Sequence, residues 1–498
     1  MLTHLPVIVA IGEITDRPSD LLHSREPIGL MSQALHRAEQ DANADLLLRL
    51  DSLDIVHQVS WRYDKTASQL CDRLKIKPAR AVYGVTGGES PMRYIHEAAL
   101  RITRGESEIA AVVGAEAQYA VNKAKAAKIE LPWTRIAKDI ENPFKIEGRL
   151  NATMNAHGAI RPIHVYPFYE NASHVAWNQS PAEALRESSE LYSRFSAVAA
   201  RNPYSWSTKN LSIDEIKTPA RDNRMICYPY TKHMVANPAV NQGAAVILTS
   251  YEKARALGID KSKMIFVLGG AAAMEPRDYL QRDQYARSDA QEVVLNAMRA
   301  LCDDHRVGLD AFELYSCFPC VPKMTRRVLG LSADATPTVT GGLSFFGAPL
   351  NNYMTHATCA MVRELREGHA TTGLLYGQGE FVTKHHAIVL SRERPRSPMK
   401  SHYVVQSEVD RRRGEAPVLL TDYTGQATIE THTVIYDRDG APQNGVVIAR
   451  TMEGARLMAR VSATDCEGIE LLIDPKHSPI GLVGTVSSDE AGVLHWRA

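Results

Sequence analysis

The chain has 498 residues, with 57 basic and 57 acidic side chains, and seven cysteines. This length predicts two or three domains, because a single core stops growing beyond about 250–300 residues. The zero net charge, with no run of Lys and Arg interleaved with aromatic residues, argues against nucleic acid or an anionic membrane surface as a partner.

Three further features indicate a cytoplasmic protein. The first residues (MLTHLPVIVAIGE) soon give way to a polar stretch and do not resemble a secretory signal. No segment has the ~18 consecutive apolar residues that a membrane-spanning helix needs. Seven scattered cysteines in so long a chain favour reduced thiols over a disulfide framework.

The first third of the chain predicts alternating strands and helices. Residues 6–12 (PVIVAIG) have the pattern of a buried strand, and 27–42 (PIGLMSQALHRAEQDA) that of an amphipathic helix opened by Pro27. The alternation continues to about residue 117 and predicts a mostly parallel sheet covered by helices. From about 118 to 240 it is interrupted by segments rich in Pro, aromatic residues and Lys or Arg, which predict an inserted functional loop domain.

A strand pattern returns at 241–250 (NQGAAVILTS), and helices and strands then alternate to about residue 392. A polar, Pro-containing linker follows at 391–400. Beyond it, β-rich runs around a DRDG turn predict a small all-β, barrel-like domain over 400–498. Its single cysteine and few histidines do not provide the CxxC pairs of a structural zinc site, so no metal site is predicted.

Two segments about 260 residues apart repeat one pattern. In each, an LDxφ strand, a Gly-Gly pair, a helical run and a second strand follow in order. Gly105 and Gly114 are nine residues apart, as are Gly368 and Gly377. A unit of about 110 residues is too long for a solenoid repeat and predicts a duplicated domain. We expect residues 5–117 and 241–392 to superpose as one βαβαβ-type unit.

Three motifs fall in the order found in the thiolase superfamily: GGESPMRYIHEAALRITRGESEIAAVVGAEA (87–117), ELYSCF (313–318) and GGLSFFGAPL (341–350). Over about residues 5–392 the chain resembles thiolases, in particular the sterol-carrier type. With the added β-domain it is most similar to bacterial thiolase-like proteins of type 1, which are homologues of acetyl-CoA acetyltransferases.

The resemblance implies an α/β fold with a duplicated, five-layered αβαβα core. The N-terminal half would span 1–240, including the loop domain at about 118–240, and the C-terminal half 241–392, followed by the all-β domain from 400 to 498. It also implies coenzyme A as substrate or ligand, with no covalently bound cofactor. A homodimer is possible, as in many thiolases, and a monomer remains open.

The positions that carry catalysis in the family hold other residues here. The nucleophilic cysteine falls on Gly88 or within two residues of it, and the histidine of the GHP motif matches Ala348. The second catalytic cysteine falls on Leu375 or Tyr376. Because a thiolate near a helix N-terminus would carry the acyl group, acetyl transfer by the usual route is not expected.

Polar residues in the second copy remain as catalytic candidates: Tyr315, Ser316, Cys317, His356 and Tyr376. Their counterparts in the first copy are mostly apolar or Gly, and buried polar groups are costly unless they have partners. Tyr315 matches the family's holder of a water or a carbonyl, and it can donate to a carbonyl or take a proton from a hydroxyl. The alternative is a core tyrosine bonded to the backbone.

Other chemistry-bearing residues have simpler interpretations. Cys317 and Cys320 have CxxC spacing, but they are predicted to be buried, inert thiols. His385 and His386 are expected at the surface or at a strand end, without the third ligand that a metal needs. Ser90 is expected to be the N-cap of the helix that Pro91 enters.

In thiolases the loop domain holds coenzyme A. The resemblance therefore makes Arg135, Lys138 and His164 candidates for contacts with its phosphates, and solvated surface charge is the alternative.

Three functions stay open. The first is an acyltransferase-superfamily enzyme of fatty-acid or sterol-type metabolism that acts on a CoA thioester without the cysteine nucleophile. The second is a retro-aldol lyase acting on a β-hydroxyacyl-CoA, and the third is a non-catalytic CoA-binding or scaffold protein. An enzyme is favoured over a scaffold.

Overall fold

A computed structural model describes residues 4–136 and 150–498; Lys138 lies outside the described residues. Two half-sheets form its centre. The first contains β1 (Pro6–Thr15), β2 (Ser52–Ile55), β3 (Arg80–Tyr83), β4 (Ile109–Ala117) and β7 (Asn241–Ser250), in the order β3-β2-β4-β7-β1. The second contains β8 (Ile265–Met274), β9 (Ala311–Leu314), β10 (Thr372–Gly379) and β11 (Lys384–Ser391), in the order β8-β11-β10-β9.

The two half-sheets have matching strand pairings. β2 pairs parallel with β4 as β9 does with β10, and β4 pairs antiparallel with β7 as β10 does with β11. β7 then pairs antiparallel with β1, as β11 does with β8. A short pairing of β1 with β8, at Val7 and Phe266, joins both into one nine-stranded sheet.

The position of β7 bears on the boundary between the halves. The sequence pattern assigned this strand to the start of the second half at residue 241. In the sheet, β7 lies between β4 and β1, the place that β11 occupies in the other half. We therefore propose that the halves divide between β7 and β8 rather than at 241.

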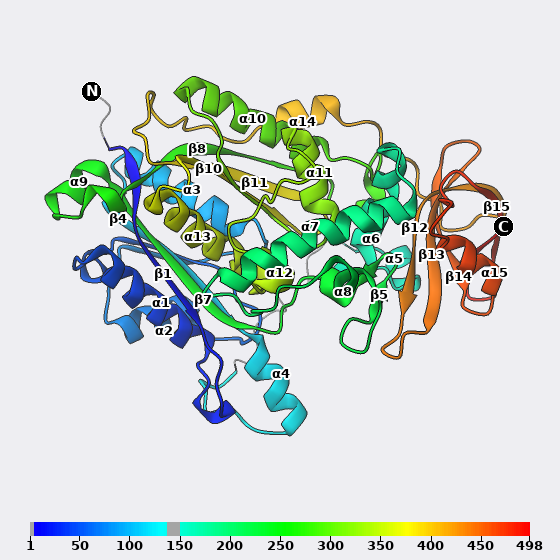
Figure 1. The fold of residues 1–498 in the computed structure, drawn as a ribbon, viewed down its shortest axis with the longest axis horizontal. Helices are drawn as coiled ribbons and strands as arrows, with labels where there is room; N and C mark the ends of the chain where they lie inside the picture. Colours follow the sequence, from blue (N-terminus) through cyan, green and yellow to red (C-terminus); the bar gives the residue numbers. More distant parts are fainter. Residues whose placement is uncertain (1–3, 137–149) are drawn as a thin grey trace.

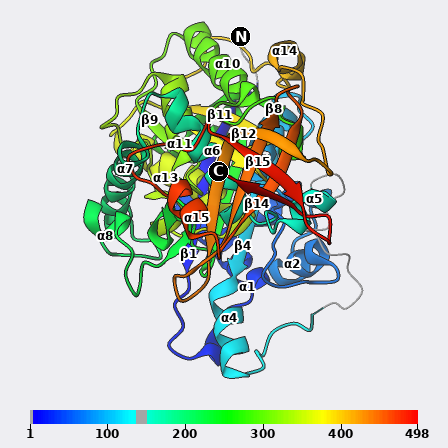
Figure 2. The same cartoon turned by 90° about the vertical axis from the view of Figure 1, so that its right-hand side faces the viewer.

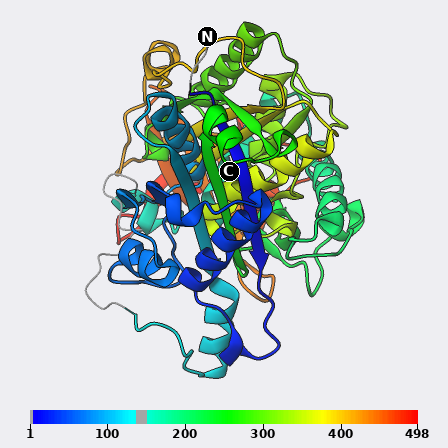
Figure 3. The ribbon, with the colours of Figure 1, turned by 90° about the vertical axis from the view of Figure 1, so that its left-hand side faces the viewer.

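Helices complete five layers, as the sequence predicted. α3 (Ser90–Thr103) and α13 (Tyr353–Glu367) pack between the half-sheets, in contact with both and with each other. α1 (Pro27–Ala42) covers the outer face of the first half-sheet and α10 (Asp289–His305) that of the second, and α2 (Thr66–Leu74) and α11 (Cys320–Leu329) lie beside them. Figure 1 shows the layers from α10 at the top to α1 and α2 below. Viewed from the left of that picture, the blue β1 runs beside the green β7 (Figure 3).

The inserted region is mainly helical. It contains α4 (Gln118–Ala127), α5 (Ala152–Ala156), α6 (Pro162–Ala176), α7 (Pro181–Arg201), α8 (Ile213–Lys217) and the short strands β5 (Met225–Cys227) and β6 (Tyr230–Thr231). A capping box between Ser180 and Glu183 fixes the start of α7. The remaining helices are α9 (Tyr251–Ala256), α12 (Gly342–Phe345) and α14 (Gln406–Arg412). No helix in the described part of the chain is long and apolar enough to cross a membrane.

The C-terminal strands close into a small barrel. They are β12 (Gly425–Tyr436), β13 (Pro442–Thr451), β14 (Arg456–Ser462), β15 (Val483–Ser488) and β16 (Leu494–Arg497), with α15 (Cys466–Leu472) between β14 and β15. The order β13-β14-β16-β15-β12, together with pairing of β12 and β13, closes the ring. Figure 2 views the molecule from the barrel side.

The barrel is attached to the inserted region. β12 also pairs with β5, and two hydrogen bonds join it to α6: the Thr431 hydroxyl donates to the Phe168 carbonyl at 2.7 Å, and the Asn171 amide to the His432 carbonyl at 2.9 Å. Because α6 also lines the cavity described next, the barrel supports one wall of that cavity.

Candidate active site

A cavity of 280 Å³ lies where the two halves meet the inserted region. It is at the carboxyl ends of β9 and β10, where α/β sheets commonly place their chemistry. Both glycine-rich turns and both strand ends contribute to its wall, together with α6: Gly87, Gly88, Tyr315, Cys317, Ala348, Asn351, Gln378, Gly379 and Tyr166.

Asn351 connects the turns that precede the two central helices. Its side-chain oxygen accepts the Gly87 N–H at 3.1 Å, and its amide donates to the His57 carbonyl at 2.9 Å. These bonds hold the turn before α3 against the turn before α13. Motif positions from the two halves, far apart in sequence, therefore face one cavity.

Gly88 has no room for a side chain. A Cβ at this position would lie 2.5 Å from the Tyr315 hydroxyl and 2.5 Å from the main-chain carbonyl oxygen of Gln378. The space into which a nucleophilic side chain would project is thus taken by the Tyr315 hydroxyl. A side chain at position 88 and the Tyr315 hydroxyl in its present place therefore exclude one another.

Tyr315 itself is 7% exposed. Its ring packs in a T-shaped arrangement with the ring of Tyr353, with 5.8 Å between the ring centroids. Burial, with contributions from Cys317 and Glu89, raises the pKa of Tyr315 well above its ordinary value, because a phenolate is poorly solvated there. No group in the described residues hydrogen-bonds to its hydroxyl. The side chain is therefore a neutral hydroxyl facing the cavity with its donor available.

Gln378 provides an unused acceptor beside it. Its amide nitrogen donates to the Tyr166 hydroxyl at 2.6 Å and to the Cys317 sulfur at 3.3 Å. Since the Tyr166 hydroxyl donates to the Glu380 carbonyl at 2.7 Å, it must accept from Gln378, which fixes the amide orientation. The Gln378 side-chain oxygen, Oε1, is buried and has no partner among the described residues.

The thiols of the CxxC segment are buried. Burial raises the pKa of Cys317 to about 12, although hydrogen bonds from Tyr166 and Gln378 oppose the shift. Burial likewise raises the pKa of Cys320, whose sulfur lies 3.8 Å from the Tyr166 carbonyl oxygen. Both thiols are therefore protonated at neutral pH and poor nucleophiles.

Three other predicted site residues do not line the cavity. The Ser316 hydroxyl accepts the Leu343 N–H at 3.3 Å. His356 pairs with Glu13 at 2.7 Å, and the Tyr376 hydroxyl bonds to His385 at 2.7 Å. All are buried in bonds that tie elements together.

Leu375 is also buried in β10 and does not face the cavity. At this end of the strand the cavity is lined by Gln378 and Gly379, and Glu380 follows them.

Two interpretations of helix and strand ends need correction. Glu89, not Ser90, is the N-cap of α3, because the helix begins at Ser90. The Ser90 hydroxyl caps nothing and has no partner among the described residues. His385 and His386 lie at the start of β11, as expected, but both are buried, because this strand runs between β8 and β10. No cluster of metal ligands occurs in the part of the chain that the structure describes.

The candidates for coenzyme A contacts are not gathered at the cavity. Arg135 is exposed and does not line it, and His164 bonds to the Gly158 carbonyl at 2.7 Å. The cation at the cavity is instead Arg161, which precedes α6 together with Pro162 and Ile163. The sequence reasoning missed this residue, although His164 stands only one helical turn later.

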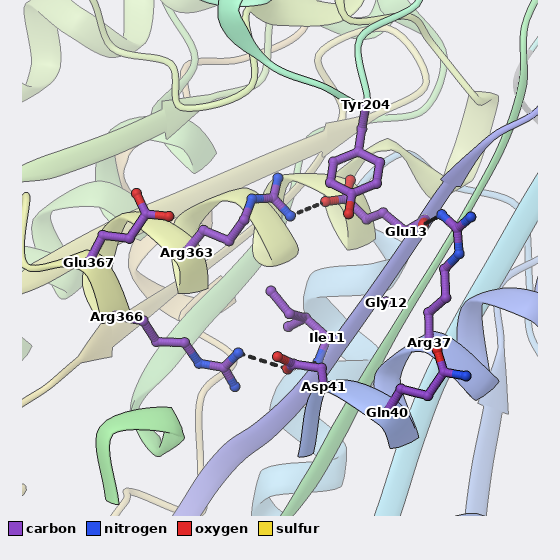
Figure 4. A pocket seen from close by; sticks show the side chains of 10 residues that line it. All are labelled: Ile11, Gly12, Glu13, Arg37, Gln40, Asp41, Tyr204, Arg363, Arg366 and Glu367. Atoms are coloured by element: carbon purple, nitrogen blue, oxygen red, sulfur yellow. Dashed lines mark hydrogen bonds and ion pairs between the residues drawn. The ribbon is translucent and has the colours of Figure 1, made fainter. Parts of the chain in front are cut away.

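A larger cavity of 530 Å³ lies elsewhere, between β1, α1 and α13 (Figure 4). Glu13 pairs with Arg363, and Asp41 pairs with Arg366 at 2.7 Å. Burial raises the pKa of Glu13, but Arg363 and His356 outweigh it, so the net shift is downward and the carboxylate stays ionised. These pairs fasten β1 and α1 of the first half to α13 of the second.

Comparison with known proteins agrees with this architecture. The family described as "Thiolase-like protein type 1 additional C-terminal domain" matches residues 404–491. The crystal structure of a monomeric SCP2-thiolase like protein type 1 from Mycobacterium smegmatis is similar over 99% of both chains, with 28% identity and a TM-score of 0.83. No curated protein sequence matches the chain.

More distant structures share the fold over the thiolase-like core. An Ltp2-ChsH2(DUF35) aldolase is similar over 78% of this chain and 98% of that one, with 14% identity and a TM-score of 0.59. Human mitochondrial 3-ketoacyl-CoA thiolase in complex with CoA is similar over 79% of this chain and 100% of its own, with 14% identity and a TM-score of 0.55. The chain therefore has a thiolase-like α/β fold followed by the small β-barrel that thiolase-like proteins of type 1 add at the C-terminus.

Proposed function

We propose that this thiolase-like protein binds a CoA thioester in the 280 Å³ cavity and cleaves a β-hydroxyacyl-CoA by a retro-aldol reaction. The observation that carries the proposal is that the Tyr315 hydroxyl fills the space a nucleophile at position 88 would need. Covalent acyl transfer has no group to carry the acyl chain, since Gly88 admits no side chain and the Cys317 thiol is protonated. Retro-aldol cleavage needs acid–base groups only.

The chemistry assigns a role to each unpartnered polar atom. The proton of the β-hydroxyl leaves, a carbonyl forms at that carbon, and the Cα–Cβ bond breaks. The electron pair of that bond passes to the thioester enolate, which then takes a proton at Cα. In this proposal the Tyr315 oxygen takes the β-hydroxyl proton as it gives up its own proton, and a proton returns by the same route to Cα. The Gln378 side-chain oxygen accepts the hydrogen bond of the β-hydroxyl.

The lining sets the class of substrate. Apart from the polar groups above, the wall is largely apolar, with Val59, Ile163, Val235, Pro238 and Leu343. The volume of 280 Å³ corresponds to about nine water volumes, so a short or medium acyl portion fits. Arg161 at the same cavity is the proposed contact for the anionic part of coenzyme A.

Two further observations are compatible with this proposal, although 3-ketoacyl-CoA thiolase shares the same fold. An aldolase has the same fold, and the M. smegmatis relative is described as monomeric, so we expect this chain to act as a monomer. All seven cysteines are free, which suits the reducing cytoplasm as the place of action.

The test uses purified protein and a panel of β-hydroxyacyl-CoA thioesters. Formation of a shortened acyl-CoA and a carbonyl product, followed by mass spectrometry, is expected without thiolysis of acetoacetyl-CoA. Tight CoA binding without turnover of any member would favour a scaffold. Thiolysis with an acyl-enzyme adduct would contradict the proposal.

A further inference from the structure

Glu89 is a buried carboxyl that the mechanism above has not used. It is 7% exposed and directly follows Gly88 at the start of α3. One of its oxygens, Oε2, is buried and has no hydrogen-bond partner among the described residues. A buried, unsatisfied carboxyl oxygen is costly and calls for a reason.

The Glu89 carboxyl lies directly behind two glycines, Gly87 and Gly379, that line the 280 Å³ cavity. A Cβ added to Gly87 or to Gly379 would overlap it, so only glycine leaves room for it at either position. Both glycines line the 280 Å³ cavity. The carboxyl is thus separated from the cavity by bare backbone, without intervening side chains.

On its other side Glu89 lines a second cleft, of 480 Å³. Lys384 lines that cleft too; it bonds to the Thr86 carbonyl at 3.2 Å and pairs with Glu380 at 3.0 Å. Glu380 in turn lines the first cavity and pairs with Arg277 at 2.6 Å. A single wall containing Glu89 therefore stands between the candidate active site and a separate, solvent-connected cleft.

We propose that Glu89 is the proton-relay partner of Tyr315, storing the substrate proton during the reaction and exchanging it with solvent through the second cleft. The proposal rests on the proposed function. In the cleavage direction the β-hydroxyl proton passes to the Tyr315 oxygen while the Tyr315 proton passes, through a bridging water, to the Glu89 carboxylate. The Cα–Cβ bond breaks, its electron pair enters the enolate, and the same relay returns a proton to Cα. Hydrogen atoms and electrons balance without a further reactant.

The electrostatics suit this role. Burial raises the pKa of Glu89 above its ordinary value, and Lys384 and Arg93 oppose the shift. The charge of Glu89 in turn contributes to the raised pKa of Tyr315, so the protonation state of Glu89 affects the proton affinity of the Tyr315 hydroxyl. The charged and titratable groups facing Glu89 or lining its cleft are Arg93, Glu97, Arg277, Glu380, Lys384, His385, His386, Tyr315 and Tyr403.

A Glu89→Gln variant tests the relay, because it keeps the size of the side chain and removes the exchangeable proton. We expect turnover of the β-hydroxyacyl-CoA to fall by a factor on the order of a hundred, within the range for a general acid–base group. The limb of the pH profile that reports deprotonation of Glu89 should disappear, with CoA affinity and melting temperature unchanged. Glu97→Gln is the matched control, since Glu97 lies on the same helix and lines the same cleft.

A second measurement needs no substrate. Difference infrared spectra of the free protein across pH should show the carbonyl band of a protonated carboxylic acid that is absent from Glu89→Gln and present in Glu97→Gln. If no compound is turned over, the proposed function fails, while the infrared band still reports on Glu89. Unchanged turnover with an unchanged pH profile in Glu89→Gln, or a carboxyl that stays ionised down to its ordinary pKa, would overturn the relay.

Discussion

The two cavities at the junction of the halves differ in how their polar groups are satisfied. The larger one, beside β1 and α13, is lined by carboxylates and guanidinium groups that pair with one another across the two halves. The smaller one presents the Tyr315 hydroxyl and the Gln378 side-chain oxygen, which have no partners among residues 4–136 and 150–498, and Glu89 lies behind its wall. The larger volume therefore does not identify the cavity whose polar atoms lack partners among the described residues.

This difference distinguishes polar groups that stabilise the fold from polar groups that are available to a ligand or a reacting group. Buried charges that are fully paired hold elements in register, and removing one partner leaves the other uncompensated. Buried polar atoms without partners are a cost to the fold that a ligand or a reacting group can relieve. We therefore expect substitutions around the larger cavity to act on stability, and substitutions around the smaller one to act on turnover.

The largest expected effect belongs to the larger cavity. Glu13→Ala leaves Arg363 and His356 without their buried partner, so the free energy of unfolding should fall by about 3–5 kcal/mol, as measured by denaturant titration. Glu367→Ala, at the exposed rim of the same cavity, should change it by no more than about 0.5 kcal/mol. If Glu13→Ala unfolds with the same free energy as the parent protein, the expected difference between the two cavities is wrong.

Tyr315→Phe should show the opposite behaviour. Turnover should fall about 100-fold or more, equivalent to about 2.7 kcal/mol in activation free energy. Stability should hardly change, because no described residue bonds to the hydroxyl. Tyr353→Phe is the control: its hydroxyl bonds to Glu313 at 2.7 Å, so it should lose about 1–3 kcal/mol of stability. Equal losses of stability in both variants would make Tyr315 a structural tyrosine.

Gly88→Ala tests how tightly the wall of the smaller cavity is packed at position 88. The new methyl group would meet the Tyr315 hydroxyl and the main-chain carbonyl of Gln378, so we expect a loss of about 1–3 kcal/mol of stability together with loss of turnover. Gly308→Ala is the control, since its nearest neighbour would be 3.7 Å away. If Gly88→Ala has the same melting temperature as the parent protein, Tyr315 and Gln378 can move aside and a nucleophilic side chain would fit at position 88.

The smallest effect is expected at the surface. Arg161→Ala should weaken CoA binding by about 0.5–1 kcal/mol, a two- to fivefold change that shrinks at high salt, because the contact is exposed and screened. Calorimetric titration at two salt concentrations measures both. Arg135→Ala, remote from the cavity lining, should bind CoA as the parent does; a larger effect there would restore the original assignment.

The sequence predicts the fold well because its signals are local and repeated. Strand and helix periodicity, the paired glycine turns and the equal glycine spacings each lie within one half. The sequence pattern assigned β7 to the second half because a strand pattern says nothing about neighbours, and only the sheet order places this strand between β4 and β1.

The site was harder to predict because its parts come together across long distances. Of the candidates, Tyr315 lines the cavity, whereas His356 and Tyr376 have partners from β1 and β11 that spacing cannot reveal. No sequence signal distinguishes Glu89 from other charged residues at helix starts. Its place behind Gly379 depends on the end of β10 lying against the start of α3, about 290 residues away in sequence.

The central position of β1 has a consequence for biosynthesis. This strand is made first, yet both of its neighbours, β7 and β8, follow about 235–260 residues later. At about 5–20 residues per second, the ribosome would leave its two hydrogen-bonding edges open for about 10–50 s. An apolar strand that waits so long is a natural binding segment for a chaperone, so protein yield in cells should depend on chaperone supply more than the stability of the finished fold would suggest.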